Sequence, residues 1–113
     1  MTDEASTGWT GGAKAFGDFA SGLAHYTDKV LFDEVWERES LDKRDRSLIT
    51  VAALTTMGKT DQLKFHLPFA LQNGVELEEL KEAILHLAFY AGWPNAMAAM
   101  TVLKDAVEAE AGD

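Results

Sequence analysis

Residues 60–92 read TDQLKFHLPFALQNGVELEELKEAILHLAFYAG, and this stretch decides the fold. Its first half repeats mainly apolar residues three or four positions apart, which is typical of one helix face: Leu63, His66, Leu67 and Ala70. Asn73-Gly74 predicts the end of this helix. Glu78 and Glu79 favour the first turn of a second helix, where the helix dipole stabilises acids, and Gly92 predicts its end.

The same periodicity continues on both sides of this stretch. We expect a helix over about residues 43–57 and another from Pro94-Asn95 to about residue 109. Towards the N-terminus, one helix face carries Phe16, Phe19, Ala20 and Leu23. Asp28 is a candidate N-cap for a further helix to about residue 38.

Sustained alternation of apolar and polar residues, the pattern of strands, is missing. The sequence therefore predicts an all-α fold, with about five or six helices in a single compact domain over residues 14–113. The small polar residues of 1–13 predict a flexible N-terminal arm, in which Trp9 is a candidate anchor onto the body or a neighbouring subunit.

Composition narrows the functional classes. The 113 residues include 10 Lys+Arg and 19 Asp+Glu, a net charge of −9, and no cysteine. The acidic balance argues against a nucleic-acid partner, which requires clustered basic residues. We find no long apolar run and no signal-peptide pattern, so we expect a cytoplasmic protein with no membrane partner. A sequence without cysteine has no disulfide, no thiolate metal site and no thiol chemistry of its own.

Positive charge is concentrated in one part of the chain. Residues 43–66 hold five Lys and Arg against two Asp, a local charge of +3. Arg44 and Arg46 belong to this stretch, and guanidinium groups bind carboxylates through paired hydrogen bonds. They are candidates for holding an anionic ligand, with a solvated helix face as the alternative.

Two histidines occupy apolar settings. His66 falls on the apolar face of its helix, and His86 lies between Leu85 and Leu87 on the next. Antiparallel helices can bring such residues to one pocket, where imidazoles transfer protons near neutral pH. The alternative is a structural core histidine for each, and His25 is expected to be structural or exposed. The histidine spacing does not match a metal site, and Glu82 is placed to orient His86 one turn away.

The joint Tyr90-Ala91-Gly92-Trp93-Pro94 combines a helix stop with a helix start. Tyr90 follows His86 by one helical turn. We consider Tyr90 and Trp93 as pocket walls, with structural packing of the two aromatics as the alternative.

Residues 41–99 resemble the carboxymuconolactone decarboxylase family, and with its flanks the match covers roughly residues 28–109. Four features follow in the family's order: an R-x-R-S-L-x-T start, a His in the K-x-H position, an A-L-x-N-G turn and an H-x-A-x-Y-A-G-x-P box. The resemblance implies an alkylhydroperoxidase-D-like helical fold assembled as a trimer or hexamer. One branch of the family uses a Cys-x-x-Cys before the histidine; Lys59 and Gln62 stand at those positions here. The chain therefore resembles the branch without cysteines, the decarboxylases, which use neither metal nor cofactor.

The resemblance also implies a chemistry. The substrate would be a small anionic lactone that loses CO₂ into its own conjugated ring. His66 and His86 are the candidate proton donors, and the choice between them stays open. Arg46, with Arg44, would contact a carboxylate or oxyanion, while Tyr90 and Trp93 would line the substrate site. The open alternative is a non-catalytic or differently specific helical oligomer of the same family.

Oligomerisation is also expected from the residues themselves. Most of the expected helices carry apolar residues around more than roughly a third of their circumference. A domain of this length is too small to bury all of them, so we expect subunits to cover the rest.

Overall fold

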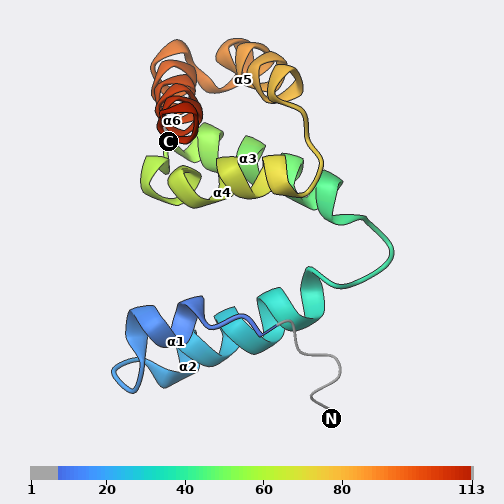
Figure 1. Cartoon of the computed structure of the whole chain (residues 1–113), viewed down its shortest axis with the longest axis vertical. Coiled ribbons are helices and arrows are strands. Elements are labelled where there is room, and N and C mark those ends of the chain that lie inside the picture. Colours follow the sequence, from blue (N-terminus) through green and yellow to red (C-terminus); the bar gives the residue numbers. More distant parts are fainter. Residues whose placement is uncertain (1–7, 113) are drawn as a thin grey trace. The chain divides into compact units, whose positions relative to one another are not determined.

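The computed structural model describes residues 8–112, and these residues contain helices and no strand. The all-α class predicted from the sequence is confirmed. The chain divides into two compact units, Met1–Lys43 and Arg44–Asp113, which we call the N-terminal unit and the C-terminal unit. The helices follow in the order α1 Gly11–Phe16, α2 Ser21–His25, the π-helix η2 Tyr26–Val35, α3 Lys43–Met57, α4 Thr60–Gln72, α5 Leu77–Ala91 and α6 Trp93–Ala111 (Figure 1).

The C-terminal unit is built on the periodicity that the sequence predicts. Its core joins residues from α3 to α6, among them Val51, Leu63, Leu67, Ala70, Leu80, Ile84, Ala99 and Leu103, all at most 1% exposed. On α4, α5 and α6 these residues are three, four or seven positions apart, so each of these helices turns one stripe inward. Met97 on α6 lies outside this core, and its side chain is 60% exposed.

Polar contacts fix α3 to the other helices of this unit. The Asn73 side-chain amide, just after α4, donates to the Ser47 hydroxyl at 2.9 Å, and Ser47 is fully buried. At the other end of α3, the Asn95 amide donates to the Thr56 carbonyl at 3.1 Å. A buried polar group is costly unless it is hydrogen-bonded, so the Ser47 contact specifies how α3 sits.

Local signals in the sequence fix where α5 begins and where α6 follows it. At the start of α5, the Glu79 carboxylate accepts the Glu76 backbone N–H at 2.9 Å and completes a capping box. A single residue, Gly92, connects α5 to α6 at φ 100° and ψ 145°. This φ favours glycine. Helix α6 therefore begins at Trp93, one residue earlier than expected.

The N-terminal unit differs from the sequence prediction. Gly17, at φ 49°, ends α1, so the expected face from Phe16 to Leu23 is broken and Phe19 is 96% exposed. Asp28 is also not an N-cap, because it lies inside η2. Its buried carboxylate instead accepts the backbone N–H groups of Gly12 at 2.6 Å and Ala13 at 2.8 Å. These N–H groups at the start of α1 have no partner within the helix, which is why a carboxylate is stabilised there.

Trp9 anchors its segment within this unit. Its ring stacks on Phe32 with centroids 4.0 Å apart, and Phe32 stacks in turn on Trp36 at 5.8 Å. The predicted arm of residues 1–13 falls largely on residues 1–7, which lie outside the described part of the chain, while residues 11–13 are already in α1.

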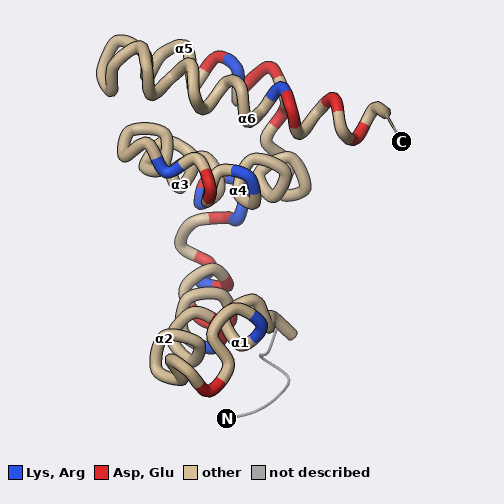
Figure 2. Tube along the Cα trace, turned by 90° about the vertical axis from the view of Figure 1, so that its left-hand side faces the viewer, with Lys and Arg blue, Asp and Glu red and all other residues tan. Residues whose placement is uncertain are grey.

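Charge is unevenly distributed along the C-terminal unit. Residues 83–103, from the middle of α5 to the middle of α6, contain no Lys, Arg, Asp or Glu, whereas both neighbouring segments do (Figure 2). Within residues 8–112, no helix has the length and apolar character needed to cross a membrane.

Candidate active site

His66 lies at the edge of the core, half-buried on α4. Leu63 and Ala70, one turn before and after it on the same face, are fully buried. The rings of Phe65 and Phe69 flank the imidazole, with centroids 4.9 and 6.1 Å from it. Burial lowers the pKa of His66 below its ordinary value, because desolvation disfavours the charged imidazolium. A titratable group with a shifted pKa in apolar surroundings is the kind of residue that active sites use for proton transfer.

His86 is exposed on α5 and lines a groove of about 420 Å³. We call this the His86 groove; the residues that line it with His86 come from α3 and α5, namely Leu48, Ala52, Glu79, Glu82, Ala83 and Leu87. The Tyr90 ring lies 4.9 Å from the imidazole, centroid to centroid. Glu82 shares the groove, but among the described side chains no hydrogen bond joins it to His86, so the expected orienting contact is not formed. His66 is not among the residues of this groove.

Arg44 is brought to the rim of the His86 groove by a tertiary ion pair. Its guanidinium donates to the carboxylate of Glu79, which lies 35 residues later in the first turn of α5 and lines the groove. It also donates to Asp45 at 3.3 Å. The hydrogen bond to Glu79 raises the pKa of Arg44 above its ordinary value. The Glu76 backbone N–H, followed by Arg44, lowers the pKa of Glu79.

The other predicted residues lie elsewhere on α3, α5 and α6. Arg46 is half-buried on α3, and its backbone carbonyl accepts the Thr50 hydroxyl at 2.8 Å. Tyr90 and Trp93 are 79% and 53% exposed, and neither lines the His86 groove. The structure thus places Arg44 beside the groove of His86, and it does not gather the other candidates around the same groove.

Sequence reasoning missed two residues that organise this region. Glu79 was expected only as a helix-start acid, yet it also holds Arg44. Asn73 was expected only as a helix stop, yet it binds Ser47. Both pairings join residues far apart in sequence, so no local pattern could reveal them. Asn73 lies within the A-L-x-N-G motif, whereas Glu79 lies outside all four family-like motifs.

Metal binding has no obvious site among residues 8–112, where no group of three or more His, Asp or Glu side chains is placed to hold an ion.

Comparison with known proteins adds to this geometry. The sequence model of the carboxymuconolactone decarboxylase family matches residues 21–105, most of the chain and all the candidate site residues. The chain belongs to this family. This match confirms the resemblance that the sequence motifs indicated.

Three relatives of this family member are informative. It is 40% identical over 88 residues to a 4-carboxymuconolactone decarboxylase of Acinetobacter baylyi, covering 78% of this chain and 66% of that protein. It is 37% identical over 73 residues to the nitrosuccinic acid decarboxylase npaB of Metarhizium robertsii, covering 65% and 51% of the two chains. It is 28% identical over 78 residues to an uncharacterized 15.0 kDa protein of Paracoccus denitrificans, covering 67% and 58%. The chain therefore spans between 51% and 66% of the length of these relatives.

Proposed function

We propose that the protein is a carboxy-lyase that removes CO₂ from a small anionic lactone, 4-carboxymuconolactone or a related lactone or β-oxo acid, without a cofactor. The observation that carries this proposal is the match to a protein named 4-carboxymuconolactone decarboxylase over 78% of the chain. A second relative is also named a decarboxylase, but its name gives a different acid. The two names together therefore support the type of reaction more firmly than they support a particular substrate. The lack of cysteine in the sequence supports a decarboxylase over a peroxidase that uses its own thiols.

The chemistry suits the side chains present. When the bond to the carboxylate breaks, its electron pair moves through the ring alkene to the lactone carbonyl, which gives CO₂ and a dienolate. The protein must then stabilise the negative oxygen and deliver a proton to carbon. We assign proton delivery to His66 or His86 and anion stabilisation to Arg44 and Arg46, with Tyr90 and Trp93 completing the substrate site.

His66 is one of the two candidate proton donors, and it lies outside the groove that His86 lines and that Arg44 borders. Its partly apolar surroundings lower its pKa, so the neutral imidazole is favoured before substrate binds. A bound carboxylate would raise the pKa again, because an opposite charge stabilises the imidazolium. Substrate binding would thereby load the donor with the proton that the dienolate needs.

We propose that Arg44 exchanges Glu79 for a substrate carboxylate. The guanidinium and the Glu79 carboxylate are both partly exposed, at 35% and 42% of their side-chain surface. Ion pairs in such positions contribute little net stability, so a substrate carboxylate can compete for Arg44 at small cost.

The proposal includes a homo-oligomer, a trimer or hexamer, located in the cytoplasm and acting in aromatic catabolism. Support for the oligomer comes from large apolar side chains that α5 and α6 leave uncovered: Leu85, Phe89, Tyr90, Trp93 and Met97 are 47–79% exposed. They lie within the segment without Lys, Arg, Asp or Glu, residues 83–103 (Figure 2). Large apolar side chains left exposed within one such segment favour an interaction surface. Light scattering that finds only a 12.4 kDa species would contradict this part.

An assay of CO₂ release tests the function. We expect the purified chain to release CO₂ from 4-carboxymuconolactone or a related lactone, and His66→Ala to lose most of this rate. His25→Ala is the matched control, because His25 is an exposed histidine of the N-terminal unit. No release from any such lactone would favour the non-catalytic helical oligomer, and full activity of His66→Ala would refute the role of His66.

A further inference from the structure

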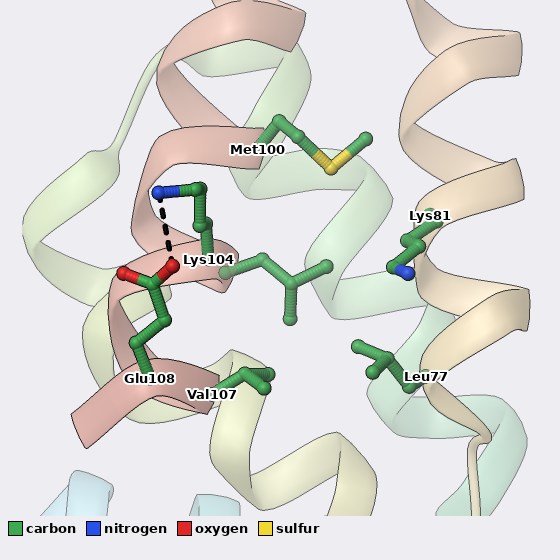
Figure 3. Close-up of a pocket in the computed structure, with 7 residues that line it drawn as sticks. Leu77, Lys81, Met100, Lys104, Val107 and Glu108 are labelled. Carbon is green, nitrogen blue, oxygen red and sulfur yellow. Dashed lines mark ion pairs between the residues drawn. The ribbon is translucent and has the colours of Figure 1, made fainter. Parts of the chain in front are cut away.

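A second groove, separate from the His86 groove, lies between α5 and α6. It has a volume of about 330 Å³, near the lower end of the ~300–1,000 Å³ range of small-molecule sites. Its apolar lining comes from Leu77 on α5 and from Met100, Leu103 and Val107 on α6 (Figure 3). The two grooves have no lining residue in common. An apolar hollow of this size fits a short aliphatic or aryl group.

Two lysines stand at this groove on opposite helices. Lys81 comes from α5 and Lys104 from α6, on either side of the apolar side chains (Figure 3). We call the hollow the Lys81–Lys104 groove. From residue 75 to the end, the sequence has two lysines and no arginine, and both lysines line this groove. The basic charge of an otherwise acidic segment is therefore concentrated at one apolar hollow.

Each lysine is paired with an acid of its own helix. Lys81 lies 3.0 Å from Glu78, and Lys104 lies 3.0 Å from Glu108, which also lines the groove. The lysine side chains are 49% and 69% exposed. Exposed pairs within one helix contribute little, so a ligand carboxylate could replace either acid at small cost. The hydrogen bond to Glu108 raises the pKa of Lys104 above its ordinary value.

We propose that the Lys81–Lys104 groove binds a small amphipathic carboxylate, a compound with one anionic head and a short apolar body. Charge complementarity selects this class. The apolar lining removes the body from water, while the two ammonium groups hold the carboxylate at the rim. This site is additional to the proposed lactone site and does not depend on the proposed activity.

Octanoate is a suitable probe, and the methionine methyl groups are suitable reporters. In the full chain labelled with ¹³C-methyl methionine, the NMR signal of Met100 reports on the groove. Met57 and Met97, 59% and 60% exposed and outside the groove, are internal controls. We expect octanoate to shift Met100 in a saturable manner and to leave the other two nearly unmoved. Octanamide, which has the same body without the charge, should bind more weakly.

Charge variants complete the test. The double variant Lys81→Gln/Lys104→Gln should weaken octanoate binding about fivefold or more and leave octanamide binding unchanged. Glu108→Gln should change affinity in the opposite direction, tightening octanoate about twofold, because it removes a competing carboxylate. Retained helical circular dichroism confirms that each variant folds.

Three results would overturn the proposal. The first is no Met100 shift at about 10 mM octanoate, the weakest binding of interest. The second is equal octanoate affinity in the double variant and the parent chain. The third is a Met100 signal that moves on dilution of the protein but not with octanoate, which would assign the groove to a second copy of the chain.

Discussion

The buried contact between Ser47 and Asn73 provides a sharp test of how α3 is held. The Asn73 amide donates to the Ser47 hydroxyl at 2.9 Å, with Ser47 fully buried and Asn73 only half-buried. Asn73→Ala leaves the buried hydroxyl without this donor, which should cost about 1–3 kcal/mol. Ser47→Ala leaves an amide that water can reach, so we expect only about 0.5–1.5 kcal/mol.

Urea unfolding followed by far-ultraviolet circular dichroism measures both costs at one fixed protein concentration. With a slope of about 1–3 kcal/mol per molar urea, a loss of about 2 kcal/mol moves the midpoint by roughly 1 M. The double variant should be less destabilised than the sum of the two single variants, by about 1 kcal/mol, because both remove the same bond. Thr101→Ala is the control: it deletes an exposed hydroxyl that donates to a helix carbonyl at 2.9 Å, and it should change stability by less than about 0.5 kcal/mol.

Two outcomes would refute this reasoning. If Ser47→Ala cost more than Asn73→Ala, the burial difference between the two groups would not govern the penalty. If the losses added fully in the double variant, the two side chains would not be energetically coupled, and another contact would hold α3.

Three further predictions follow from the titratable groups. Because burial lowers the pKa of His66, the unfolded chain binds its proton more readily than the native chain, and stability should fall as the pH drops below about 6.5. His66→Gln should lose less stability than the parent chain between about pH 7.5 and about pH 5.5 in urea titrations, and an equal loss would contradict the assignment. Asp28→Ala should speed amide hydrogen exchange across α1, because two backbone N–H groups lose their acceptor; unchanged exchange would show that the carboxylate does not hold this helix. Arg44→Gln should raise the pKa of Glu79 in an NMR titration but leave it below its ordinary value, because the Glu76 backbone N–H still donates to it. A pKa that does not move would show that the ion pair is not formed in solution.

Sequence periodicity predicted the C-terminal unit closely, for a physical reason. The helix expected over residues 43–57 is α3, and the glycines at 58, 74 and 92 all lie at helix ends with positive φ. Each of these signals is local: a repeat of apolar residues, a capping acid or a glycine that permits an unusual backbone angle.

The N-terminal unit was harder to predict because its stabilising contacts are not local. The Asp28 carboxylate looks like a helix start in the sequence, but its partners lie 15 and 16 residues earlier. The apolar repeat across Phe16 and Leu23 is genuine, yet the backbone turns at Gly17 and interrupts it. Periodicity reports which side chains would share a face, and it cannot report whether the helix continues.

The candidate site shows the same limit. The sequence pointed to Arg44 and His86 separately, and the structure connects them through Glu79, which pairs with one and lines the groove of the other. The sequence left open whether Tyr90 and Trp93 line a pocket or pack structurally, and in the C-terminal unit their side chains are 79% and 53% exposed. Apolar residues at helical spacing can lie in the core or on an exposed surface, and the spacing alone does not show which.

Gly92 is the single residue that connects α5 to α6, so a change in its backbone angles would rotate one helix relative to the other. Lys81 and Lys104 stand 11 and 12 residues from this glycine, about 16–18 Å along their helices at 1.5 Å per residue, so a change of about 10° at Gly92 would displace the far ends by about 3 Å. That displacement is comparable to the thickness of the aliphatic chain that the groove is proposed to bind. A change in the backbone angles of Gly92, which is remote from either lysine, would therefore alter the width of the groove between them.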